Sequence, residues 1–143
     1  MSLKPLKLYG QSSADVEVIS TYLQDAVAQL GDMAYLVDEK RFVLLANRFR
    51  WETEGAPMRV RCALQLANIV SIRQKKLNLM RREGVVALLA INFEPQNLPA
   101  GEINLQFAGG GEISLAVEAC EAILEDITAP WAANSRPQHD LDE

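Results

Sequence analysis

Apolar positions recur at helical spacing near the start of this chain. Over 12–30, apolar side chains return every three or four residues and form a single stripe between polar ones. Ser12 and Asp15 are typical of an N-terminal capping pair, and Gly31 is well placed to end a helix in the left-handed conformation. The pattern predicts a helix over 12–30.

An alternation of period two follows, and it is strongest over 43–66. Two alternating runs flank the polar loop 52–57, which predicts a long antiparallel hairpin. A pairing in which position numbers sum to 109 collects Val43, Leu45 and Phe49 with Val60, Cys62 and Leu64 on an inner face. A shift by one residue would move a strand's side chains to the opposite face, so this sorting predicts the register. The solvent face then carries four arginines, namely Arg48, Arg50, Arg59 and Arg61.

The remaining pattern predicts further strands at 33–37 and 85–93, a fourth strand made of 69–72 and 77–79 with room for a break near 73–76, and a second hairpin formed by 103–107 and 113–117. The run 85–93 is apolar at both odd and even positions, which is typical of a strand covered on both sides. After 117 the period changes, and four apolar residues follow helical spacing up to Pro130. This predicts a closing helix over 117–127 with a stripe of Val117, Cys120, Leu124 and Ile127.

This order of elements resembles the pleckstrin-homology-like fold over residues 33–128. The resemblance rests on the alternation at 60–66, the strands at 103–107 and 113–115 with their glycine turn, and the helix at 117–127. It implies an α+β fold: a bent antiparallel sheet or barrel of about seven strands, a C-terminal helix capping its open end, and the N-terminal helix as an addition.

The whole chain also resembles a small bacterial family known only as a domain of unknown function. The opening helix, the run at 41–51 and the turn at 109–113 carry this resemblance. Because no activity is established for that family, the resemblance implies no catalytic or binding residue.

Length and composition predict a single globular domain over 1–131, followed by a polar tail over 132–143 that we expect to be disordered. No apolar run reaches the length of about 18 residues needed for a transmembrane segment, and the start of the chain lacks the pattern of a signal peptide. Cys62 and Cys120 both fall on apolar faces, which suits reduced thiols. We therefore expect a cytoplasmic protein.

Charge is unevenly distributed along the chain. Segment 40–82 holds eleven basic and two acidic residues, whereas the rest of the chain carries most of the acids behind a net charge of −5. In the expected register, Arg48 faces Arg61 and Arg50 faces Arg59, and like charges in such pairs cost about 0.2–1 kcal/mol each. Two interpretations stay open: an internal network of salt bridges, or a docking surface for an anionic group.

Signals for catalysis, metals and cofactors are weak. The single histidine, His139, falls in the expected tail, and no cysteine or histidine spacing suits zinc. The glycines at 109–111 lack the lysine and the helix of a phosphate-binding loop. We expect no catalytic residue, no metal and no cofactor.

The leading hypothesis is a non-enzymatic binding or adaptor domain that docks a protein partner, or a second copy of itself, through Arg48, Arg50, Arg59 and Arg61. One alternative is binding of anionic lipid headgroups or nucleic acid through the same arginine face, although the acidic net charge disfavours nucleic acid. A second alternative is an enzyme whose site the sequence does not reveal.

Overall fold

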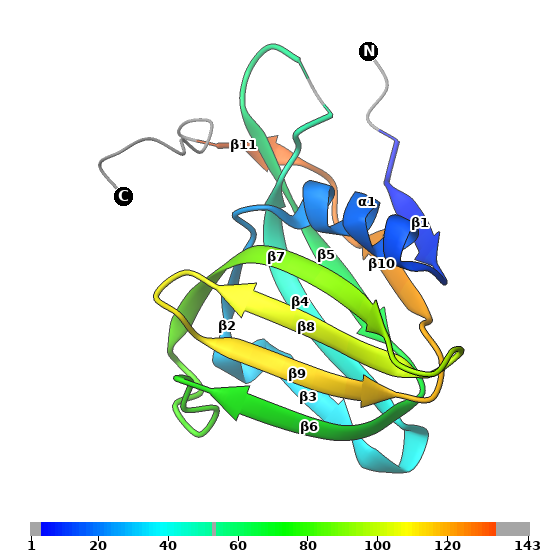
Figure 1. Cartoon of the computed structure of the whole chain (residues 1–143). Coiled ribbons are helices and arrows are strands. Elements are labelled where there is room, and N and C mark those ends of the chain that lie inside the picture. The colour runs from blue at the N-terminus through cyan, green and yellow to red at the C-terminus, as the bar shows by residue number, and fades with distance from the viewer. Residues whose placement is uncertain (1–3, 53, 134–143) are drawn as a thin grey trace.

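The computed structural model describes residues 4–52 and 54–133, and this part of the chain forms one antiparallel sheet of eleven strands with a single α-helix (Figure 1). The elements are β1 (Lys7–Gly10), α1 (Ser13–Leu23), β2 (Val27–Gln29), β3 (Met33–Leu36), β4 (Arg41–Phe49), β5 (Met58–Leu66), β6 (Ile69–Lys75), β7 (Val85–Pro95), β8 (Gly101–Phe107), β9 (Glu112–Val117), β10 (Ala122–Asp126) and β11 (Trp131–Ala132).

The sheet bends into two layers that face each other. Its strand order is β1-β10-β5-β4-β2-β7-β8-β9-β6, with β3 pairing β4 and β11 pairing β5. In Figure 1, β7, β8, β9 and β6 form the front layer, and β1, β10, β5 and β4 lie behind it. Strand β2 joins the layers because it pairs with β4 on one side and with β7 on the other.

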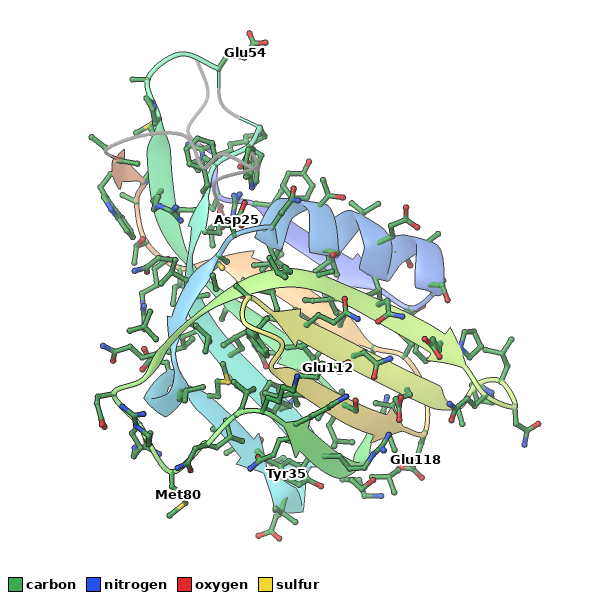
Figure 2. All side chains as sticks on the ribbon, turned by 60° about the vertical axis from the view of Figure 1, so that its left-hand side comes forward. Asp25, Tyr35, Glu54, Met80, Glu112 and Glu118 are labelled. Carbon is green, nitrogen blue, oxygen red and sulfur yellow. The ribbon has the colours of Figure 1, made fainter. Side chains whose placement is uncertain are left out.

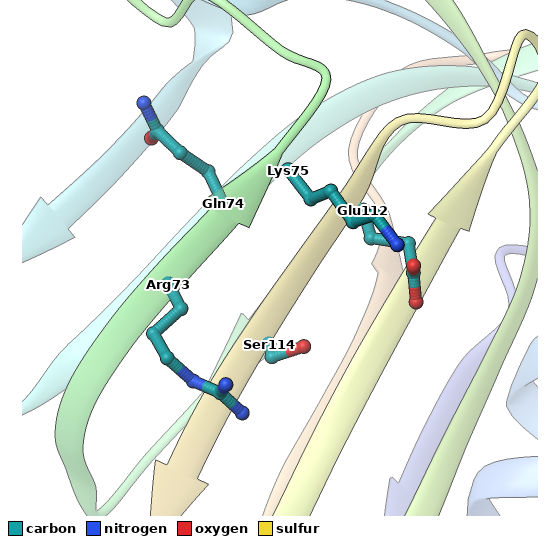
Figure 3. A pocket seen from close by; sticks show the side chains of 5 residues that line it. All are labelled: Arg73, Gln74, Lys75, Glu112 and Ser114. Atoms are coloured by element: carbon teal, nitrogen blue, oxygen red, sulfur yellow. The ribbon is translucent and has the colours of Figure 1, made fainter.

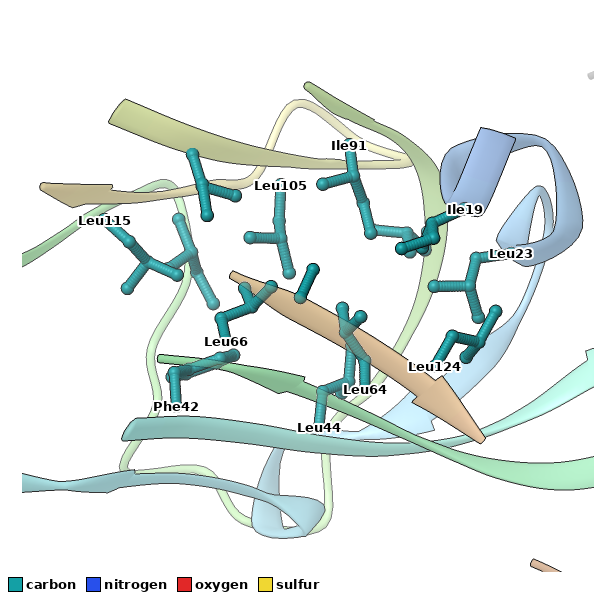
Figure 4. Close-up of a cluster of buried hydrophobic side chains, with 14 of the residues drawn as sticks. Ile19, Leu23, Phe42, Leu44, Leu64, Leu66, Ile91, Leu105, Leu115 and Leu124 are labelled. Atoms are coloured by element: carbon teal, nitrogen blue, oxygen red, sulfur yellow. The ribbon is translucent and has the colours of Figure 1, made fainter. Parts of the chain in front are cut away.

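The core lies between these two layers. Figure 4 shows Leu105 and Leu115 from one layer meeting Leu44, Leu64 and Leu66 from the other. Helix α1 covers one end of this space and buries Val16, Ile19 and Leu23 against it. Burial of this continuous apolar set is what holds the two layers together.

The predicted N-terminal helix begins as expected but ends early. The N–H of Asp15 donates to Ser12 Oγ at 3.2 Å, as the capping prediction requires. The helix ends at Leu23, and Asp25 adopts a positive φ of 64°, which turns the chain into β2. The apolar residues that follow therefore extend a sheet instead of a helical stripe, so the prediction of a helix reaching residue 30 is wrong.

The predicted C-terminal helix over 117–127 is also wrong. Val117 ends β9, and the chain then turns and forms β10. In β10, Ala122, Leu124 and Asp126 are buried and alternate with less buried residues. This strand lies between β1 and β5, so hydrogen bonds to two distant strands replace those of a local helix.

These findings correct the fold class. The described chain is an open, mostly antiparallel sheet with one short helix, not a pleckstrin-homology-like α+β fold with a capping C-terminal helix. The expectation failed because that fold needs a helix where the chain places β10 in the interior of the sheet. The strand at 85–93 and the hairpin of 103–107 with 113–117 are present as β7, β8 and β9.

The β4–β5 hairpin exists, but its predicted register is wrong by one residue. Observed partners sum to 108, as in Leu44 opposite Leu64 and Ala46 opposite Cys62. Even-numbered residues of both strands therefore face the core together. Strand β4 is apolar at both odd and even positions between 42 and 46, so its sequence suits either face and did not determine the pairing.

Two further expectations concern the ends of the chain. The predicted tail begins at Ala132, which the structure places in β11, paired with Met58. Residues 134–143, including His139, lie outside the described residues. None of the helices in the described ranges combines the length and the apolar character that a membrane crossing requires.

Candidate functional site

The structure does not bring the four predicted arginines together on one solvent face. Arg48 is 0% exposed and Arg50 is 3% exposed, whereas Arg59 and Arg61 are partly exposed. The observed register explains this separation, because even positions of β4 face the opposite side from odd positions of β5. The predicted arginine face is therefore corrected to two separate pairs.

Arg48 is a fully hydrogen-bonded buried cation. Its Nε and Nη2 donate to the two carboxylate oxygens of Asp126, both at 2.9 Å. Its Nη1 and Nη2 donate to the two oxygens of Glu52 at 3.0 and 2.7 Å, and Nη1 also reaches the carbonyl oxygen of Phe49 at 3.3 Å. Two bidentate pairs of this kind hold a guanidinium in one orientation. For Arg48, the internal salt-bridge interpretation is the correct one.

The ionisation of this cluster follows from its contacts. Burial alone would lower the pKa of Arg48, but its hydrogen bonds with Glu52 and Asp126 and their charges raise that pKa above the usual range. Burial alone would raise the pKa of Glu52, but the hydrogen bond from Arg48 and the charges of Arg48 and Arg50 hold it below its ordinary value. The contacts therefore favour a charged guanidinium beside a charged carboxylate.

Asp126 is the partner that sequence reasoning missed. It is buried at the end of β10, opposite Cys62 of β5, and its Oδ2 also accepts the N–H of Leu6 at 2.9 Å. If 122–126 is read as a strand, Asp126 falls on the same buried face as Leu124, and a buried acid of this kind needs a cationic partner. The predicted helix concealed that signal, because it gave these residues a different period.

Arg50 lies two residues after Arg48 and makes far fewer hydrogen bonds than Arg48 does. Its Nε reaches Glu52 Oε2 only at 3.4 Å. Its Nη1 is buried and finds no hydrogen-bond acceptor among the described residues. A buried donor without an acceptor is uncommon in folded proteins and needs an explanation.

A pocket of about 340 Å³ adjoins this guanidinium, and we call it the Arg50 pocket. It forms where the segment before β1, the ends of β4 and β5 and the segment after β10 meet. Its walls are mostly apolar, and its polar contributors include Lys4 as well as Arg50 and Asp126. The apolar wall consists of Pro5, Val60, Ala129 and Pro130.

The outer pair of arginines is held by other groups. Arg61 donates to Asp32 Oδ2 at 3.1 Å and to Asn47 Oδ1 at 3.2 Å. Arg59 donates to the carbonyl oxygen of Asn47 at 3.3 Å, and its guanidinium lies 6.0 Å from the centre of the Phe49 ring. Burial lowers the pKa of Arg59. These contacts engage both side chains along the strand surface.

The loop between β4 and β5 projects from the sheet and does not form a flat surface on which a partner could dock. Figure 2 shows Glu54 at the tip of this loop, which projects beyond both layers of the sheet. Glu52, near the base of the same loop, turns inward to Arg48 and Arg50. The loop therefore supplies one of the two carboxylates of the buried cluster.

A larger hollow of about 610 Å³ lies on the outside of β6 and β9, and Figure 3 shows the side chains that line it. Arg73 and Lys75 line it beside Glu112 and Ser114. Arg73 already pairs with Glu102 at 2.6 Å and is 72% exposed at its side chain. The water around such exposed charges competes with any ligand, so this hollow is a weaker candidate than the Arg50 pocket.

Comparison with known protein families identifies one family to which this chain is similar. A family model described as "Protein of unknown function (DUF2948)" matches residues 6–139. The chain belongs to this family. No curated protein and no solved structure matches it. The description of this family names no activity.

Both cysteines of this member of the DUF2948 family are buried. Within residues 4–52 and 54–133, no group of three or more histidine, cysteine or acidic side chains is placed to hold a metal ion. Burial raises the pKa of Cys62 to about 12 and that of Cys120 to about 11. Both thiols are therefore protonated near neutral pH, where a nucleophilic cysteine needs to be a thiolate.

Proposed function

We propose that this chain is a non-enzymatic binding domain whose Arg50 pocket receives an anionic group of a ligand or partner. The observation that carries the proposal is the buried Nη1 of Arg50, which lacks an acceptor among the described residues beside a pocket. Arg48 has no such vacancy, because both of its carboxylate partners are in place. The proposal therefore narrows the docking hypothesis from four arginines to one.

The free-energy cost of a buried, unpaired donor favours a ligand oxygen next to Arg50 Nη1. Leaving a buried donor unpaired costs about 1–3 kcal/mol, and more when the group is charged. A ligand oxygen in the pocket would remove that cost and gain a charge-assisted hydrogen bond. Nη1 is buried, so the Arg50 side chain would turn toward the pocket to meet the ligand, while the cluster around Arg48 holds the neighbouring backbone in place.

Binding is favoured over catalysis because the other polar groups of the pocket are already engaged. Asp126 accepts hydrogen bonds from Arg48 and from Leu6. The hydroxyl of Thr128 accepts the N–H of Arg61 at 3.1 Å and donates to the carbonyl oxygen of Ala129 at 3.1 Å. Asp126 is held by the Arg48 cation, and the Thr128 hydroxyl donates its proton to a backbone carbonyl and not to a base, so neither group is placed to act as a general base or a nucleophile.

The alternative of lipid-headgroup or nucleic-acid binding has less support. It requires several guanidinium groups on one accessible face, and the observed register separates the four arginines. The buried thiols accord with a reducing compartment, where we expect this domain to act.

The test is a titration of the isotope-labelled protein with millimolar acetate, benzoate and inorganic phosphate, followed by NMR. We expect at least one anion to shift the amide signals of residues 4–6 and 126–130. Arg50→Gln should abolish these shifts, whereas Arg73→Gln, which removes the same charge from an exposed site, should keep them. The proposal fails if no anion shifts these signals in the unaltered protein.

A further inference from the structure

We infer that the Arg50 pocket takes a monocarboxylate carried on a compact apolar body, in preference to a phosphate. This inference rests on the proposed function and narrows its ligand class. Three properties of the pocket carry it: the balance of charge, the number of free donors, and the chemistry of its walls.

The charges beside the pocket already balance. Arg48 and Arg50 face the two carboxylates of Glu52 and Asp126, and Asp126 itself lines the pocket. Any further negative charge would lie close to Asp126 in a site of low dielectric, so a monoanion is disfavoured less than a dianion.

The unpaired donor of Arg50, Nη1, suits an oxygen of a carboxylate. The single hydrogen bond that Arg50 makes through its side chain within the described residues is the long contact from Nε to Glu52. Nη1 is buried and has no acceptor among the described residues. One oxygen of a carboxylate can accept a charge-assisted hydrogen bond from this nitrogen. A phosphate would bring further oxygens that this one nitrogen cannot all satisfy.

The apolar walls of the pocket favour a ligand whose carboxylate is attached to an apolar group. Pro5, Val60, Ala129 and Pro130 would face the rest of the ligand. At about 340 Å³ the pocket lies at the small end of ligand sites. Phosphate oxygens turned toward these side chains would lose hydration without gaining hydrogen bonds, whereas a small ring or branched chain would gain from burial.

An ordered water on Arg50 Nη1 is the competing explanation. A single water would satisfy the donor and leave the pocket without a preference among anions. The two explanations differ in a measurable way, because only a carboxylate site distinguishes ligands that share a body but differ in their charged group.

The experiment compares benzoate, benzyl alcohol, phenyl phosphate and acetate by NMR titration of the full chain. We expect benzoate to bind about tenfold more tightly than phenyl phosphate and acetate, a difference of about 1.4 kcal/mol, and benzyl alcohol to bind weakest. Arg50→Gln should remove benzoate binding, and Arg73→Gln should leave it unchanged. Ala129→Trp, which fills the pocket without touching a charge, should also remove benzoate binding and serves if Arg50→Gln does not fold.

The outcomes separate this inference from the proposed function. Tighter binding of phenyl phosphate that still depends on Arg50 overturns the carboxylate class and leaves the anion-binding function standing. Benzoate binding that survives both Arg50→Gln and Ala129→Trp overturns the inference. Absence of binding by every anion overturns both the inference and the function, and it assigns water to Arg50.

A final comparison distinguishes two sources of the carboxylate. N-acetylleucine represents a free acid, and the tripeptide Gly-Gly-Leu with a free or an amidated end represents the terminus of a protein chain. Tighter binding of the free-ended tripeptide assigns the site to a chain terminus, and tighter binding of N-acetylleucine assigns it to a small acid. Equal binding of the amidated tripeptide contradicts a carboxylate site.

Discussion

The two faces of the β4–β5 hairpin hold their arginines in opposite ways. On the core side, Arg48 and Arg50 are buried near two carboxylates. On the outer side, Arg59 and Arg61 lie partly in solvent; both donate to Asn47, and Arg61 also donates to Asp32. Exposure would suggest that the outer pair is the binding pair. The contacts suggest the reverse, because within residues 4–52 and 54–133 the one buried nitrogen of these four side chains that lacks an acceptor belongs to Arg50.

The comparison continues within the buried face itself. Arg48 and Arg50 share Glu52, yet Arg48 also has Asp126, and that second carboxylate completes its hydrogen bonds. A buried cation with a complete set of partners stabilises the fold, and one with an incomplete set is available to a ligand. Mutations that separate these two roles test the distinction.

The largest effect is expected at Arg48. Arg48→Met would leave Asp126 buried without its cation and would release Glu52, so we expect a loss of about 3–5 kcal/mol in the free energy of unfolding. Urea denaturation followed by circular dichroism measures this loss. Adding Asp126→Leu should restore part of it, since the second change removes the uncompensated charge. A loss below about 1 kcal/mol for the single variant would contradict a structural role for Arg48.

A smaller effect is expected from the titration of Glu52. Its pKa in the folded protein lies below the ordinary value, so the carboxylate contributes stability above that ordinary value and loses it as the pH falls. Thermal melting should therefore show a decline that begins near the ordinary glutamate pKa of about 4.3 and continues below it.

The matched variant for this prediction is Glu52→Gln, which cannot titrate at this position. Its melting temperature at pH 7 should be lower than that of the unaltered protein, and its decline between pH 5 and pH 3 should be shallower. Parallel acid declines in the two proteins would show that Glu52 does not carry this dependence.

The outer face should respond less. Arg61→Gln removes a partly exposed pair with Asp32, at 31% and 33% exposure of the two side chains. Pairs of this kind contribute about 0.2–1 kcal/mol, so we expect a loss in that range. The pair should also weaken in 1 M salt, because screening acts on exposed charges. A loss as large as that of Arg48→Met would remove the contrast between the two faces.

The smallest effect on stability is expected at Arg50, although it is nearly as buried as Arg48. Arg50→Met replaces an under-bonded cation by an apolar side chain, and Glu52 keeps its short contacts with Arg48. The free energy of unfolding should change by less than about 1 kcal/mol in either direction. Anion binding in the Arg50 pocket should be lost in the same variant. A stability loss near that of Arg48→Met would assign both arginines to one structural network.

Several local elements could be predicted from the amino-acid pattern. The capping pair of Ser12 and Asp15 marked the start of α1, and the alternation around Gly109 and Gly110 marked the β8–β9 hairpin. Both glycines adopt the positive φ that this turn requires, at 89° and 93°. These elements depend on residues close together in the chain, so their signals are local.

The candidate site could be predicted only in part. Arg48 and Arg50 were selected as functional candidates, and Arg50 lines the pocket that we propose binds a ligand. Asp126 was missed, and its 78-residue separation from Arg48 explains why. The Arg50 pocket itself forms from four segments that are distant in the sequence, so no short sequence motif predicts it.

The amino-acid order was sufficient to place the start of the helix, the two hairpins and the abundance of strands, since each follows from spacing within a few residues. The pairing of β4 with β5 and the insertion of β10 between β1 and β5 were decided by packing. Strand β4 is apolar on both faces and 122–126 suits two periods, so neither segment specifies its own partner. Only when the distant strands assemble do Asp126, Arg48 and Arg50 meet, because the energy that selects their arrangement comes from burial and hydrogen bonds across the whole sheet.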